Sequence, residues 1–167
     1  MHKENKKGAK IHRAIFLLFL LKVNNNEPIV GITRLEKLMF LIISEVLKDT
    51  QLNGNYYVFE PYKYGPFSSG IFDDVQLMED MGYITREKLN EGQTKFVITG
   101  KGIEKIDDIM HKFPENIRKY LEKIQNEIAI IKSEKNSISL RKLLSYVYQK
   151  YPEFTINSEI KDKIHSY

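Results

Sequence analysis

The pattern of apolar and polar positions is clearest in the middle of the chain. Apolar residues at helical spacing predict an amphipathic helix over residues 69–81, and Gly82 would end this helix in the left-handed conformation. Residues 83–89 and 94–99 alternate well enough to predict a two-stranded hairpin, because successive side chains of a strand point to opposite faces. Thr99 can then cap a further helix. Together these patterns predict an α+β fold in which helices predominate.

The N-terminal part predicts two more helices with a short strand between them. The apolar run Ala14–Leu21 lies within a predicted helix over residues 10–23, and a short strand is predicted over 29–32. Thr33 and Glu36 have the spacing of a capping box, in which each side chain bonds a backbone N–H of the other residue. The helix that they would start has a wide apolar stripe, which indicates packing against the core.

A helix after Pro114 carries an apolar seam. Its apolar residues step by four, three, four and three positions, the heptad pattern of a helix that packs along another helix: Ile117, Leu121, Ile124, Ile128 and Ile131. About two heptads are present, so two partners fit this seam. One is the first helix of the same chain, and the other is a second copy of the chain in a homodimer. Ser137 or Ser139 would cap a last helix.

The order of helix, hairpin and helix is the second half of a winged helix-turn-helix. This fold mostly binds DNA and is often reused to bind protein, so it does not by itself fix a function. The sequence therefore predicts a basic arm over residues 1–9, a winged-helix domain over 10–112 and a C-terminal helical extension over 113–167. Across residues 70–106 the chain resembles winged-helix proteins of the PadR and MarR kind, on the strings Leu77–Ile84 and Ile98–Gly102.

A second resemblance rests on two short motifs. Leu35–Phe40 reads L-E-K-L-M-F and Lys63–Ser68 reads K-Y-G-P-F-S, and both look similar to motifs of the YwgA-like and SocA-like (Panacea) proteins. The likeness covers about residues 10–105. It implies a small bacterial, archaeal or phage-associated protein that acts as an antitoxin or a protein adaptor. The tryptophan that often precedes the family's Y-G-P turn is replaced here by Tyr62, which favours the YwgA-like side.

The charge of the chain is unevenly distributed. The net charge is +4, and residues 1–13 account for it with five basic residues and one acidic residue. The predicted helix over 69–81 has four acidic residues and no lysine or arginine. A helix that reads DNA usually presents basic or amide side chains, and carboxylates near phosphates oppose binding.

Two functions follow from this distribution, and both describe a small non-enzymatic regulator. The first is a DNA-binding transcriptional regulator, as a monomer or a homodimer, whose contacts come from the arm, the turn, the helix start and the wing: Lys6, Lys7, Lys10, Arg13, Lys63, Ser68, Ser69, Gln76, Arg86, Lys88 and Lys95. The second is an antitoxin or adaptor whose acidic helix docks on a basic protein partner through Asp73, Asp74, Glu79 and Asp80.

Other kinds of chemistry find little support in the sequence. The chain has no cysteine, and its four histidines are scattered without ligand spacing, so we expect no metal and no cofactor. No nucleophile motif or phosphate-binding loop occurs, so we expect no enzyme activity. The apolar run Ala14–Leu21 is too short to span a bilayer, and a cytoplasmic protein is expected. The aromatic residues over 56–67 fit either a stacking surface for single-stranded nucleic acid or a part of the core.

Overall fold

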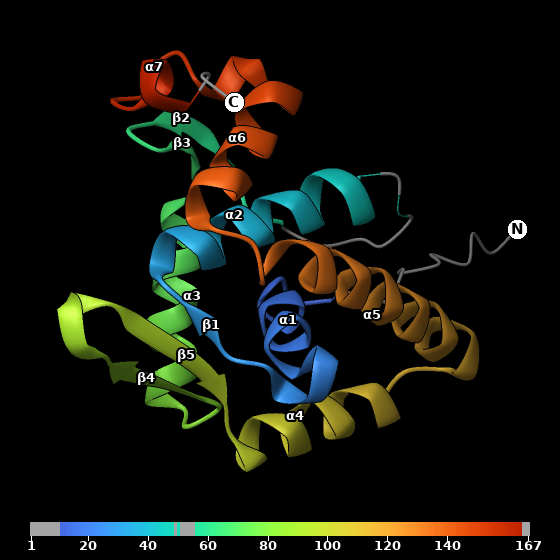
Figure 1. Ribbon diagram of the computed structural model, residues 1–167. Coiled ribbons are helices and arrows are strands. Elements are labelled where there is room, and N and C mark those ends of the chain that lie inside the picture. Colours follow the sequence, from blue (N-terminus) through green and yellow to red (C-terminus); the bar gives the residue numbers. More distant parts are fainter. Residues whose placement is uncertain (1–10, 49, 51–55, 165–167) are drawn as a thin grey trace, which may run out of the picture.

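The computed structural model describes residues 11–48, 50 and 56–164, and the fold is α+β and mainly helical, as predicted (Figure 1). The α-helices are α1 (Ala14–Asn26), α2 (Ile32–Leu41), α3 (Ser69–Asp80), α4 (Gly100–His111), α5 (Glu115–Lys135), α6 (Leu140–Lys150) and α7 (Lys161–Ile164). The strands are β1 (Ile29–Val30), β2 (Glu60–Tyr62), β3 (Gly65–Phe67), β4 (Ile84–Lys88) and β5 (Thr94–Ile98). A π-helical turn, Ile42–Val46, continues α2, and 3₁₀ turns form at Asn90–Gly92 and Pro152–Phe154.

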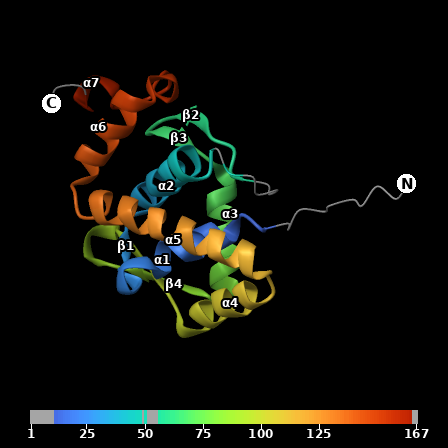
Figure 2. The ribbon, with the colours of Figure 1, turned by 90° about the vertical axis from the view of Figure 1, so that its right-hand side faces the viewer.

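Helix α1 lies at the centre of the molecule, with α5, α4 and β5 packed around it (Figures 1 and 2). All eight residues of its apolar run, Ala14 to Leu21, are buried, as expected for a helix that is hydrophobic on every side. The predicted seam of α5 packs within the chain, because Leu121, Ile124, Ile128 and Ile131 are buried and Ile117 is half-buried. Of the two partners that fit the seam, α1 therefore takes this role, and a homodimer would need another surface.

The C-terminal end of α1 is held by a buried lysine of α5. Val23 leaves the helical conformation, and residues 24–26, all asparagines, have φ between 56° and 59°. Asparagine tolerates this left-handed region better than most side chains. Lys132 is fully buried, and its Nζ donates to the carbonyl oxygens of Val23 at 2.9 Å and Leu21 at 3.5 Å. Burial lowers the pKa of this amine to about 8.

The buried amine of Lys132 makes the stability of the protein depend on pH. Above pH 8 the folded chain releases this proton, whereas the unfolded chain holds it up to the ordinary pKa of 10.5, so the free energy of unfolding rises with pH in this window. Lys132→Met should reduce that rise by about 2 kcal/mol between about pH 7.5 and pH 9.5, measured by urea unfolding. Lys123→Met, on the exposed side of the same helix, should keep the wild-type rise. An unchanged rise in Lys132→Met would contradict the burial of a titrating amine.

A three-stranded antiparallel sheet lies on the other side of α1 from α5 (Figure 1). Its strand order is β1–β5–β4, with Ile29 opposite Phe96 and Ile84 opposite Ile98. All four side chains are buried. The sheet therefore presents one apolar side to the core, and β5 contacts α1. The short strand and the hairpin that the sequence predicted are both confirmed.

The turns around this sheet also follow the sequence. Gly82 has a φ of 77° and ends α3 in the left-handed conformation, as predicted. The Thr99 hydroxyl accepts the N–H of Gly102 at 3.1 Å and donates to the carbonyl oxygen of Gly82 at 2.6 Å. Thr99 thus caps α4 and at the same time fixes the turn at the end of α3.

The predicted capping box at the start of α2 is wrong. The helix begins at Ile32, after Gly31, whose φ of 96° is unfavourable for other residues. Thr33 consequently lies inside the first turn, and Glu36 turns into the core with only 4% of its surface exposed. The predicted helix also changes character after Leu41, where the π-helical turn begins.

The β2–β3 hairpin projects beside α6 and α7, at the end of the molecule away from the sheet (Figure 1). Gly65, with a φ of 85°, lies so close to Tyr148 of α6 that a Cβ atom would come within 2.8 Å of the ring. The N–H of Glu159 donates to the carbonyl oxygen of Lys63 at 2.9 Å. The C-terminal region thus packs on this hairpin and fixes its position next to the start of α3.

Candidate functional site

Helix α3 joins the β2–β3 hairpin to the sheet and exposes one face that is apolar and acidic. This surface, called the α3 face below, consists of Ser69, Phe72, Asp73, Gln76, Leu77, Asp80 and Met81. Phe72, Leu77 and Met81 are 38%, 45% and 41% exposed. No lysine or arginine occurs in the helix. At helical spacing Phe72 lies on one edge of this face and Leu77 and Met81 on the other, with Asp73 and Asp80 between them. Exposed apolar side chains next to charged ones are typical of a protein-binding surface.

A row of aromatic rings extends the α3 face onto the β2–β3 hairpin. The ring centroids of Tyr62 and Phe67 are 4.8 Å apart, and those of Phe67 and Phe72 are 5.4 Å apart, with tilts of 37° and 36°. Tyr62 and the nearby Tyr64 are each 45% exposed. We call Tyr62, Phe67 and Phe72 the aromatic row. Its rings have a large contact area and little freedom to lose, which favours binding.

The structure places one part of the aromatic segment in the core and the other part at the surface. Tyr57 is buried, and Tyr56 and Phe59 are half-buried against the core. Tyr62 and Tyr64 are exposed on the hairpin. The aromatic residues before β2 pack in the core, and Tyr62 and Tyr64 on the hairpin lie at the surface.

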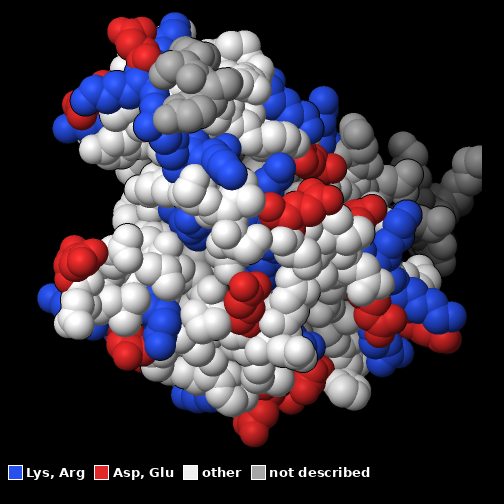
Figure 3. All heavy atoms as spheres, viewed as in Figure 1, with Lys and Arg blue, Asp and Glu red and all other residues white. Residues whose placement is uncertain are grey.

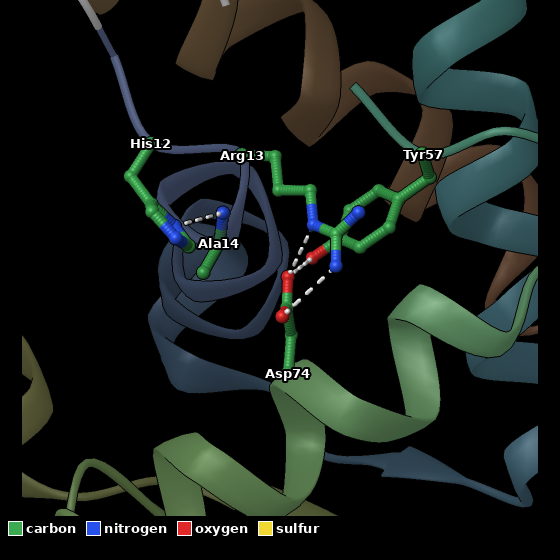
Figure 4. A network of polar contacts seen from close by, with 5 residues as sticks. All are labelled: His12, Arg13, Ala14, Tyr57 and Asp74. Atoms are coloured by element: carbon green, nitrogen blue, oxygen red, sulfur yellow. Dashed lines mark hydrogen bonds and ion pairs between the residues drawn. The ribbon is translucent and has the colours of Figure 1, made fainter. Parts of the chain in front are cut away.

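A buried polar network fixes the position of α3 against α1 (Figure 4). Asp74 Oδ2 accepts from Arg13 Nε at 2.9 Å and from the Tyr57 hydroxyl at 2.6 Å, and Asp74 Oδ1 accepts from Arg13 Nη2 at 3.3 Å. The Arg13 guanidinium also lies over the Tyr57 ring, 4.7 Å from its centroid. Burial, the hydrogen bond to Asp74 and its charge raise the pKa of Tyr57, so the hydroxyl stays a donor. The hydrogen bond to Asp74 raises the pKa of Arg13.

Two expectations from the sequence are corrected by this network. Asp74 was expected on an exposed acidic face, but only 5% of it is exposed, and its two oxygens are taken by Arg13 and Tyr57. Arg13 was expected to extend the basic arm toward DNA, but its guanidinium points inward to α3 (Figure 4). Gly70 leaves room for it, since a Cβ at that position would come within 2.9 Å of the guanidinium nitrogens.

The β4–β5 hairpin, which the sequence predicts to be a wing and which keeps that name below, carries paired charges. Arg86 Nε donates to Glu79 Oε2 at 2.7 Å, and Arg86 also contacts the side-chain oxygen of Gln76. The hydrogen bond to Arg86 lowers the pKa of Glu79. Gln76 donates in turn to Asp80 Oδ1 at 2.9 Å. Arg86 and Gln76, two of the candidate DNA contacts, are thus hydrogen-bonded to acids of the candidate partner-binding set. These acids are Glu79 and Asp80.

The other basic residues of the wing differ in their pairing. Lys95 Nζ lies 2.8 Å from Glu87 Oε2, whereas Lys88 is exposed and forms no ion pair with the residues that the structure describes. Figure 3 shows acidic and basic side chains side by side over the β4–β5 hairpin. The wing therefore presents mixed charge.

The remaining DNA-contact candidates do not gather on the wing. Lys63 lies on the β2–β3 hairpin, at the opposite end of α3 from the wing, with Nζ 3.8 Å from Glu159 Oε1 (Figure 1). Ser68 is buried, and Ser69 is exposed at the start of α3. Three basic residues of the arm lie outside the residues that the structure describes: Lys6, Lys7 and Lys10.

A buried ion pair, which the sequence reasoning did not anticipate, joins the L-E-K-L-M-F and K-Y-G-P-F-S motifs. Lys37 is 1% exposed, and its Nζ donates to Glu36 Oε1 at 2.6 Å and to the carbonyl oxygen of Pro66 at 2.8 Å. Glu36 Oε2 accepts the N–H of Ser68 at 3.5 Å. Burial raises the pKa of Glu36 and lowers that of Lys37. The pair fixes the strand that leads into α3 against α2.

A second polar cluster lies where the π-helical turn meets α6. Glu45 Oε1 accepts from the Tyr146 hydroxyl at 3.0 Å, Lys150 Nζ at 2.9 Å and the Tyr151 hydroxyl at 3.2 Å. Burial and the charge of Glu45 raise the pKa of Tyr151 to about 12. An open pocket of about 640 Å³ adjoins the cluster. The π-helical turn places Glu45 toward α6, and such turns often occur at functional sites.

The described residues contain no group of three or more histidine, aspartate or glutamate side chains arranged to hold a metal ion. Within the same residues, no helix combines the length and the apolar character needed to cross a membrane.

Comparison with known proteins identifies no family for this chain, so its function is inferred from the structure. No protein-family model matches the chain, and no curated protein sequence shows significant similarity to it.

Proposed function

We propose that this protein is a non-enzymatic adaptor or antitoxin-type regulator that binds a protein partner through the α3 face and the aromatic row. The observation that carries the proposal is the composition of the α3 face. Phe72, Leu77 and Met81 are exposed there beside Asp73 and Asp80, without a lysine or arginine in the helix. A polyanion such as DNA would be repelled by this surface.

The scaffold that we propose is a winged helix-turn-helix. The strand order β1–β5–β4, with β4 and β5 forming a hairpin directly after α3, supports this assignment. In such a domain α3 would occupy the position of the recognition helix. The β2–β3 hairpin between α2 and α3 is an addition to the simple winged-helix order, and it contributes two rings of the aromatic row.

The chemistry of the partner follows from the surface. The apolar edges of the α3 face would contact apolar or aromatic side chains of the partner, since such anchors supply most of the energy in protein interfaces. Asp73 and Asp80 would face lysine or arginine, because complementary charge speeds association and sets the orientation. Glu79 is already paired with Arg86 and would contribute less. We therefore expect a partner surface with basic side chains opposite Asp73 and Asp80 and apolar side chains on either side of them.

The first test is affinity purification from the source cells with quantitative mass spectrometry. A true partner should be captured by the wild type, lost with Asp73→Lys/Asp80→Lys, and retained by Glu122→Lys/Glu134→Lys. The last variant makes the same charge change on exposed positions of α5. A partner that survives the α3 change would place the interface elsewhere.

DNA binding is the second candidate, and two features favour it. Lys88 is exposed on the wing without an ion pair among the described residues, and residues 1–13 carry the net positive charge of the chain. Fluorescence anisotropy with the upstream DNA and a scrambled duplex, between about 50 and 200 mM salt, separates the candidates. A preference for the upstream DNA that survives the higher salt and weakens in Lys88→Glu would establish a DNA regulator. Weak binding that is equal on both duplexes would favour the adaptor.

A further inference from the structure

An apolar pocket of about 350 Å³ lies between α1, α3 and α4. It is distinct from the polar clusters described above and shares only its edge with the α3 face. Each of the three helices or its flanking turn contributes walls: Ile15 and Leu18 from α1, Leu77 and Met81 from α3, and Lys105 and Ile109 from α4. A pocket of this size, mainly apolar with a few polar groups, is typical of a site for a small organic molecule.

The edge of the pocket exposes apolar surface that the fold leaves uncovered. Leu77 and Met81 are 45% and 41% exposed, although both line the pocket. Leaving such side chains in water is unfavourable in proportion to their exposed apolar area. A ligand with an apolar ring would cover them from inside the pocket. Tyr83 and Phe113, which also line it, offer aromatic surfaces for that ring.

The polar groups of the pocket favour an anion. Lys105 lines the pocket, and its Nζ lies 6.0 Å from the Tyr83 ring centroid, with Lys101 Nζ at 5.6 Å from the same ring. Neither lysine forms an ion pair with a residue that the structure describes. No acidic residue occurs among the described residues that line the pocket. Lys105 is therefore the charged side chain among the described residues that line the pocket, and it can donate to a carboxylate.

A histidine supplies a second donor. His12 lines the pocket, and its Nδ1 accepts the backbone N–H of Ala14 at 3.1 Å (Figure 4). In the neutral ring the proton is consequently on Nε2, which is a donor.

We propose that this pocket binds a small organic carboxylate with an apolar ring. The ring lies between α1, α3 and α4, and the carboxylate faces Lys105. This binding site goes beyond the proposed function, and it shares Leu77 and Met81 with the α3 face.

The test uses isothermal titration calorimetry of the full chain with 1-naphthoate and its neutral analogue 1-naphthamide. Naphthoate should bind about fivefold more tightly, the effect of one partly exposed ion pair. Lys105→Met should remove that preference and leave the affinity for naphthamide unchanged. Lys101→Met is the matched control, because Lys101 lies at the same tyrosine ring without lining the pocket. It should keep most of the preference.

The location of binding is checked by NMR on the same samples. Naphthoate should shift the backbone amide signals of Ile15, Leu77 and Ile109, which come from the three walls. Absence of binding by both compounds, or shifts confined to other residues, would overturn the site. Equal affinity of the wild type for the two compounds, or a preference that Lys105→Met leaves intact, would overturn the carboxylate.

Discussion

Replacing Asp74 by alanine is expected to lower the free energy of unfolding by about 3 kcal/mol, whereas the same change at Asp73 should leave it within about 0.5 kcal/mol. The two residues are neighbours with the same side chain, but their surroundings differ. Asp74 is 5% exposed and accepts from both Arg13 and Tyr57, whereas Asp73 is exposed on the α3 face. Removing Asp74 leaves the buried Tyr57 hydroxyl without its acceptor and takes the ion-pair partner from the half-buried Arg13 guanidinium.

Urea unfolding of the wild type and both variants measures this difference. Tyr57→Phe provides a graded comparison, since it removes one hydrogen bond to a charged group and should cost about 1.5–3 kcal/mol. Arg13→Met/Asp74→Leu should lose less stability than the two single changes together, because both members of the ion pair are then removed and the Tyr57 hydroxyl loses its acceptor only once. Similar losses for Asp73→Ala and Asp74→Ala would show that the network does not hold α3.

The sequence did contain a signal for the burial of Asp74. Positions 71, 75 and 78 form the buried stripe of α3, and position 74 lies in the middle of that stripe at helical spacing. An acid at such a position requires a buried partner. The identity of the partner could not be predicted, because Arg13 lies 61 residues away in the sequence and Tyr57 lies 17 residues away.

Local sequence patterns were sufficient to predict α3 and the β4–β5 hairpin. The helix stop at Gly82, the alternation in β4 and β5, and the Thr99 cap each depend on a few consecutive residues, and each is confirmed. The capping box at Thr33 failed although its spacing is local. Glu36 instead forms a buried ion pair with Lys37 in the core. Tertiary contacts outweighed a favourable local motif.

Non-local pairing explains the remaining differences. The strands β2 and β3 have three residues each, too few for periodicity, and their hairpin packs on α6 and the C-terminal segment. The α5 seam has no feature that identifies its partner, and only the fold shows that α1 fills this role. Residue type indicates the candidate DNA contacts, but it does not reveal their pairing within the fold. Arg86 is an example, since it already forms an ion pair with Glu79.

Removing the buried ammonium group of Lys37 should be as damaging as the loss of Asp74. Lys37→Met is expected to cost about 3 kcal/mol, because it leaves the Glu36 carboxylate and the Pro66 carbonyl oxygen buried without their donor. Lys48→Met, an exposed lysine just beyond the π-helical turn, is the matched control and should stay within about 0.5 kcal/mol. Equal effects of the two changes would contradict the burial of Lys37.

The same pair predicts how the loss depends on pH. Burial raises the pKa of Glu36 above its ordinary value, and Lys37 opposes this rise, so Lys37→Met should raise the pKa of Glu36 further. A carboxyl group with a raised folded-state pKa takes up a proton in the folded state first as the pH falls. The neutral group is less costly to bury, so the folded state is stabilised. The deficit of Lys37→Met should therefore shrink between about pH 7.5 and pH 5. In Glu36→Gln/Lys37→Met no charge remains at the site, so the site should add nothing to the pH dependence of that variant's own free energy of unfolding. At about pH 7.5 its deficit should be smaller than the sum of the single changes by about 1 kcal/mol or more. Additive single changes with a pH-independent deficit in Lys37→Met would show that the two groups do not act as a pair.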